Sequence, residues 1–178
     1  MNLRKRLPAR DQILSAYAVI AFMLFAWSLL WFFWNIPSWT KFMTLGYLLA
    51  TLSYPMAASF LESLTVLALL LLPALILPAA WFRDRFAARG AAVTLGLLGT
   101  IMLRDYLIVA DNFLLRPKPI FWLTLSLSTM LLLFLAVKFQ WMEKALTLLA
   151  ERLTIFLYIF VPISVISLLT ILLRNLTL

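Results

Sequence analysis

The sequence contains neither cysteine nor histidine, and only four glycines. These absences exclude disulfide bonds, thiol nucleophiles, histidine general bases, and the usual zinc and haem ligands. No HExxH, GxSxG or glycine-rich phosphate loop occurs. We therefore expect a protein that is not an enzyme and that holds no metal ion or cofactor.

Charge is also scarce, although 65% of the residues are hydrophobic. About 20 apolar residues in a helix cover the roughly 30 Å hydrocarbon layer of a bilayer. The pattern predicts an all-α polytopic integral membrane protein, with residues 1–178 forming a single helical bundle domain of about five transmembrane helices, six being possible. The runs with almost no charge are residues 13–33, 61–82, 90–103, 120–137 and 154–173.

The basic residues predict how the bundle lies in the membrane. Because they cluster beside the predicted spans, the net charge of +8 indicates contact with lipid headgroups and not with nucleic acid. Five spans place the N-terminus in the cytoplasm and the C-terminus outside, in a bacterial-type inner membrane. This count leaves the smaller basic set outside, whereas a sixth span over residues 42–60 would nearly equalise the two sides. The outer set with five spans is Lys41, Arg104, Arg116, Lys118 and Arg174.

Two further helical segments are expected at the membrane surfaces. Residues 37–60 predict an outer interfacial or re-entrant element, with Ser38 as an N-cap and a break near Tyr54 and Pro55. Residues 138–153 alternate apolar and charged positions at helical spacing. They predict an inner amphipathic helix or an extension of the fourth span.

The candidate binding residues are Glu62, Arg104, Asp105 and Asp111, all on the predicted outer side. Arg104 lies about 22 Å along a helix from Arg89, within the hydrocarbon layer, where a charge needs a partner or a route to water. Asp105 is about 100° away around that helix, whereas Asp111 returns to the same face. We expect Glu62, of opposite charge and similar predicted depth, to contact Arg104.

Small residues mark two faces suited to close helix packing. Ala92, Gly96 and Thr100 recur every four residues in the third predicted span, with Gly99 beside them. This strip could pack within the chain or against a partner subunit. A second set in the first span suits docking to a partner helix, and consists of Ala16, Ala18, Ala21 and Ala26.

Two functions remain open at this stage. The first is a non-catalytic accessory or scaffold subunit of a membrane complex, which docks a partner membrane subunit through its apolar faces and inner amphipathic helix. The alternative is a small solute- or lipid-binding transport component, with its site on the outer side around Glu62, Arg104 and Asp105.

Overall fold

The computed structural model describes residues 7–78, 82–109 and 118–176, and its regular structure is helical throughout this part of the chain. Each helix is long and apolar enough to cross a membrane. The predicted all-α class is therefore confirmed for the described residues, which contain five helices of span length. The helices are α1 (Arg10–Trp39), α2 (Leu45–Ile76), α3 (Phe86–Val109), α4 (Lys118–Lys138) and α5 (Gln140–Leu176).

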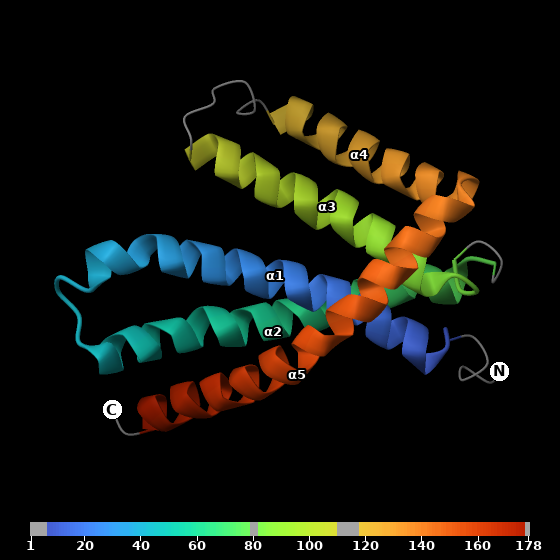
Figure 1. Ribbon diagram of the computed structural model, residues 1–178. Helices are drawn as coiled ribbons and strands as arrows, with labels where there is room; N and C mark the ends of the chain where they lie inside the picture. The colour runs from blue at the N-terminus through green and yellow to red at the C-terminus, as the bar shows by residue number, and fades with distance from the viewer. Residues whose placement is uncertain (1–6, 79–81, 110–117, 177–178) are drawn as a thin grey trace.

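The helices form two antiparallel pairs that α5 joins (Figure 1). α1 runs beside α2 and α3 runs beside α4, while α5 crosses from the end of α4 over α3 and α1 and continues along α2. We call the end where α1, α3 and α5 begin the amino end, and the opposite end the carboxyl end. The start of α1 and the end of α5 lie at these opposite ends of the bundle.

α1 is the central helix, because α2, α3 and α5 all pack against it. Every residue from 15 to 21 is buried, and Ala16, Ala18 and Ala21 are 0% exposed. Helices of this same chain thus cover three of the four alanines that were expected to dock a partner. The small side chains let three neighbours approach one helix closely.

α5 has a buried stripe from Leu146 to Ser167, and part of it packs against this central helix. Leu146, Ala150 and Leu153 share one apolar cluster with the alanines of α1 and α3, and further along Phe160 stacks on Phe25 with ring centroids 4.6 Å apart. The predicted inner amphipathic segment is therefore the first half of α5 and not a separate helix. A corner at Phe139 separates it from α4, and the backbone bonds from Phe139 N to Leu135 O (3.0 Å) and from Glu143 N to Phe139 O (3.1 Å) continue through that corner.

α2 differs most from its prediction. The helix begins at Leu45 and continues through Pro55, so the predicted break near Tyr54 is wrong and no separate outer helix stands before the second span. It ends at Ile76 and not at Phe82, because Pro78 cannot donate a backbone hydrogen bond and favours an extended residue before it. Leu77 has that extended conformation, with φ −77° and ψ 155°.

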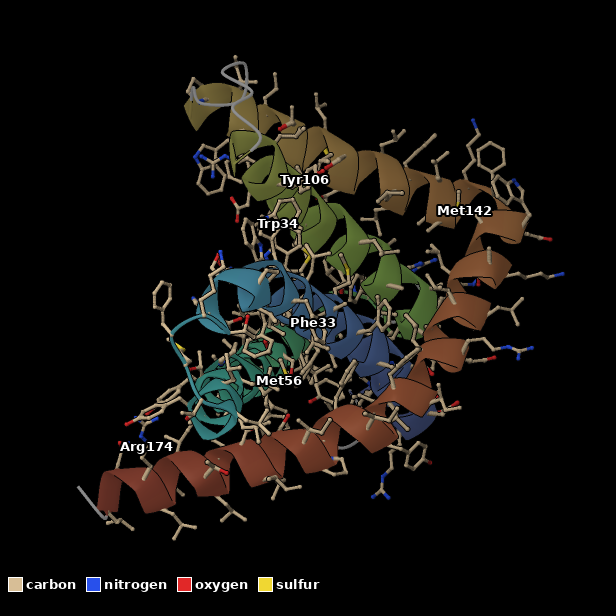
Figure 2. The ribbon with its side chains drawn as sticks, turned by 60° about the vertical axis from the view of Figure 1, so that its left-hand side comes forward. Phe33, Trp34, Met56, Tyr106, Met142 and Arg174 are labelled. Atoms are coloured by element: carbon tan, nitrogen blue, oxygen red, sulfur yellow. The ribbon has the colours of Figure 1, made fainter. Side chains whose placement is uncertain are left out.

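Some hydroxyl groups of the bundle pair with one another across helices. Ser28 Oγ lies 2.6 Å from Ser59 Oγ and joins α1 to α2. At the carboxyl end the guanidinium of Arg174 lies 5.9 Å from the ring centroid of Tyr47, which ties the last turn of α5 to the first turn of α2 (Figure 2).

The glycine strip of α3 packs against α4 within the chain. A Cβ built on Gly96 would lie 2.7 Å from the Cα of Thr129, and Thr100 Oγ1 lies 2.6 Å from Ser128 Oγ. Of the two predicted alternatives, packing inside the chain is thus the one that the structure shows. The absence of a side chain at Gly96 sets the separation of the two helices.

We predict that Gly96→Ala lowers the stability of the purified protein, because the added Cβ meets backbone that cannot move aside. Overpacking of this kind costs about 1–3 kcal/mol. Gly46→Ala is the matched control, since nothing lies within 4 Å of a Cβ at that helical position. Thermal unfolding in mild detergent compares the two variants, and equal melting temperatures would contradict this account of the α3–α4 contact.

Candidate functional site

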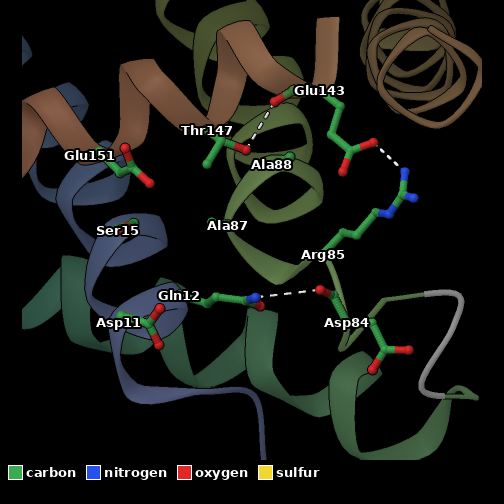
Figure 3. A pocket seen from close by; sticks show the side chains of 10 residues that line it. All are labelled: Asp11, Gln12, Ser15, Asp84, Arg85, Ala87, Ala88, Glu143, Thr147 and Glu151. Carbon is green, nitrogen blue, oxygen red and sulfur yellow. Dashed lines mark hydrogen bonds and ion pairs between the residues drawn. The ribbon is translucent and has the colours of Figure 1, made fainter. Parts of the chain in front are cut away.

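The amino end of the bundle contains a polar cavity of about 330 Å³. It lies between the start of α1, the turn before α3, the first turns of α3 and the first half of α5 (Figure 3). The lining residues are Asp11, Gln12, Ser15, Asp84, Arg85, Ala87, Ala88, Glu143, Thr147 and Glu151.

Four carboxylates line this cavity, namely Asp11, Asp84, Glu143 and Glu151, although the whole chain has only seven acidic residues and a net charge of +8. Among the lining residues that the structure describes, Arg85 is the one basic residue. The described lining therefore has more acidic than basic residues, with Glu143 paired to Arg85 and Asp84 lying 3.9 Å from Arg83 Nε. Such a cavity attracts cationic groups, such as amines or the basic side chains of a partner protein.

Gln12 of α1 fixes the beginning of α3 beside the cavity. Its Oε1 accepts a hydrogen bond from Phe86 N at 3.1 Å, and its Nε2 donates to Asp84 O at 3.3 Å. The first turn of a helix has backbone N–H groups without intrahelical partners, and a side-chain oxygen that accepts from one of them acts as a cap. One glutamine thus orients both the turn that carries Asp84 and the helix that follows it.

The remaining wall of the cavity belongs to α5. Glu143, Thr147 and Glu151 are spaced four residues apart, so they share one face of the helix. Arg85 donates a hydrogen bond to Glu143 in an ion pair that ties the start of α3 to α5. Thr147 Oγ1 donates to Glu143 O at 2.9 Å.

Sequence reasoning missed this cavity. The α5 segment was predicted only as an amphipathic helix or an extension of the fourth span, and Asp11 and Asp84 lie on other elements, far away in the sequence. The spacing of Glu143 and Glu151 was the only available signal, because it places two carboxylates on one side of an amphipathic helix. Tertiary packing supplies the rest of the site.

The predicted outer site is only partly assembled. Arg104 and Asp105, neighbours in the sequence, form a loose ion pair of 3.9 Å, which corrects the expectation that Asp105 is not a natural partner of Arg104. The guanidinium also lies 4.3 Å from the centroid of the Phe121 ring of α4. Within the described part of the chain, Arg104 Nε is buried without a hydrogen-bond partner.

Glu62 does not join this group. It is exposed on α2, and no ion pair or hydrogen bond links it to Arg104 among the described residues, so the expected Glu62–Arg104 contact is wrong. The prediction failed because α2 begins far earlier than expected, and this moves Glu62 from the predicted outer end of a span to the middle of the helix. Asp111, the fourth candidate, lies outside the described residues.

Among the residues that the structure describes, no three carboxylates are grouped closely enough to hold a metal ion. Comparison with protein-family models, with curated proteins and with solved structures finds no match to this chain. The case for a function therefore rests on the chemistry of the two charged regions, the amino-end cavity and the Arg104 group.

We predict that Gln12→Met loosens the start of α3 while leaving the bundle folded. The variant loses two hydrogen bonds, each worth about 1 kcal/mol, and keeps the size and helix propensity of the side chain. Gln140→Met is the control, because Gln140 is exposed at the beginning of α5. Hydrogen–deuterium exchange should accelerate for peptides that cover Phe86 in the first variant and stay unchanged in the second. Equal protection in both would contradict the capping role of Gln12.

Proposed function

We propose that the protein is a non-catalytic accessory or scaffold subunit of a membrane complex, and that the amino-end cavity receives a basic segment of a partner protein. The cavity carries this proposal. Its carboxylates come from three separate elements, and the Gln12 cap and the Arg85–Glu143 ion pair fix their positions. A preformed, negatively charged surface of this kind favours a partner with lysine or arginine side chains.

The proposed arrangement has the amino end in the cytoplasm and the carboxyl end outside, in a bacterial-type inner membrane that α1 to α5 cross. The start of α1 and the end of α5, at opposite ends of the bundle, support an odd number of crossings. The distribution of basic residues supports the orientation, since the amino end includes Arg83, Arg85 and Lys144. The partner segment then comes from the cytoplasm, or from the cytoplasmic end of a membrane subunit.

The test is native mass spectrometry of the protein extracted from its own membrane in mild detergent, without removal of lipid. We predict a protein partner in stoichiometric amount, and an affinity at least about tenfold lower in the double variant Asp11→Asn, Glu151→Gln. Both residues line the cavity and are exposed, so their loss spares the contacts that hold the cavity together.

Asp105→Asn, at the other end of the bundle, is the control and should leave the complex intact. Unchanged partner occupancy in the double variant would overturn the role of the cavity. A protein that leaves the membrane without any protein partner, with or without a bound small molecule, would overturn the subunit proposal.

One observation favours the alternative of a solute- or lipid-binding component. Arg104 Nε is buried and has no hydrogen-bond partner among the described residues. At the carboxyl end it can therefore donate a hydrogen bond to an anionic headgroup or to the carboxylate of a solute. The Phe121 ring beside the guanidinium would contact the apolar part of such a ligand. The second candidate function is therefore the binding of an anionic amphiphile beside Arg104.

For this second candidate we predict that an anionic lipid such as phosphatidylglycerol raises the melting temperature of the purified protein, and that Arg104→Gln abolishes the shift. Arg152→Gln is the control, because Arg152 is an exposed arginine near the opposite end of the bundle. An equal shift in the wild type and in Arg104→Gln would show that the lipid acts elsewhere.

A further inference from the structure

Glu62 lies at the middle of α2, a helix of 32 residues. α2 starts at the carboxyl end of the bundle and finishes at the amino end (Figure 1). Along the helix axis, Glu62 is about 22 Å from Tyr47, near the start, and about 21 Å from Ile76, at the finish. Because the hydrocarbon layer is roughly 30 Å thick, Glu62 lies within it whichever end of α2 is set at the membrane surface. The hydrogen bond between Ser28 and Ser59 places the neighbouring turn of α2 beside the membrane-spanning part of α1.

The side chain of Glu62 faces away from the bundle. Ala58, Thr65 and Leu69 occupy the same face of α2, at four residues before and at three and seven residues after Glu62, and all are exposed. Leu69 is 60% exposed. We call these four residues the Glu62 face. Its two small residues, Ala58 and Thr65, border the carboxylate and allow the backbone of another helix to come close.

Nothing within the described part of the chain neutralises this carboxylate. No ion pair or hydrogen bond to Glu62 forms there, and the hydroxyl of Thr65, which could have reached it, donates instead to Leu61 O at 2.9 Å. A carboxylate that faces hydrocarbon is unfavourable, and such residues in membrane proteins pair with an opposite charge or line a polar path. We therefore expect a cationic group from outside the chain to pair with Glu62.

We propose that the Glu62 face docks a transmembrane helix of a different protein, and that this helix carries a lysine or arginine near the middle of its span. A second copy of this chain fits less well. Arg104 lies toward the carboxyl end over Phe121, and Arg89 is only 7% exposed, so neither offers a cation at mid-depth on an outer face. The inference rests on the proposed subunit role, but it concerns a different surface from the amino-end cavity.

The experiment places the photo-crosslinker p-benzoylphenylalanine in place of Ala58, in the full chain expressed in its native membrane. The control position is Leu64, which is 42% exposed and about 200° around the helix from Glu62. We expect an adduct at position 58 and none at position 64. Mass spectrometry should identify a membrane protein with a lysine or arginine near the middle of one span.

Charge variants then test the pairing itself. Glu62→Gln should lower the adduct yield at least about tenfold, while Glu62→Asp retains much of it. Reversal of both charges, with Glu62→Lys in this chain and glutamate in place of the partner's basic residue, should restore the yield. Unchanged thermal unfolding of Glu62→Gln shows that the loss concerns docking and not folding.

Four results would overturn the proposal: no adduct above that at position 64, an adduct with a second copy of this chain, a partner span without a basic residue near its middle, or a yield that Glu62→Gln leaves unchanged. The Asp11→Asn, Glu151→Gln protein separates this proposal from that for the cavity. An adduct that persists in it and is lost with Glu62→Gln supports the Glu62 face even where the cavity proposal has failed. If instead the cavity variant loses its partner and no adduct forms at position 58, the proposed subunit role is retained and the proposed docking at the Glu62 face is rejected.

Discussion

The fold depends on one steric constraint, the small cross-section of the first half of α1. Three helices can surround a single helix over residues 15–21 only because alanine and serine dominate the positions that face them. Ala88, Ala91 and Ala92 of α3 and Ala150 of α5 continue the same principle in the apolar cluster. Lipid is as apolar as the helices themselves, so the hydrophobic effect does not hold them together. Close approach of the helix backbones, and the dispersion contacts that result, stabilise their association instead.

Charge is distributed around this core in three different ways. The acidic lining of the amino-end cavity is organised by Gln12 and by the pairing of Arg85 with Glu143, so each of these contacts also joins two helices. Arg104 uses its neighbour Asp105 and an aromatic ring of α4. Glu62 stands on an outer face of α2 beside Ala58, Thr65 and Leu69. The first two arrangements are contacts within the chain, whereas Glu62 has no ion pair or hydrogen bond among the described residues.

The sequence predicted the helical class and the five span-length helices of the described residues because hydrophobic length is a direct physical requirement for crossing a bilayer. It misplaced α2 because proline was treated as a break at Pro55. In a membrane helix, neighbouring helices and hydroxyl side chains can satisfy the freed carbonyl groups, and the helix continues. That single error moved Glu62 to the wrong depth and produced the mistaken Glu62–Arg104 contact. The cavity could not be predicted, since Asp11, Asp84 and Glu151 meet only through the way in which α5 crosses α1 and α3.

The central position of α1 has a consequence for biosynthesis. α1 is synthesised before α2, α3 and α5, but it is fully covered only when α5 has been added. Until then Tyr17 and Ser15, which are buried in the complete fold, contact lipid or the insertion machinery. Tyr17 finds its hydrogen-bond partner Ser63 only after α2 has emerged. The contacts between α1 and α5 join residues more than a hundred positions apart, as in the stacking of Phe25 on Phe160, and contacts of such long sequence separation form slowly. A nascent chain truncated before α5 therefore leaves the face of α1 that α5 covers without its packing partner.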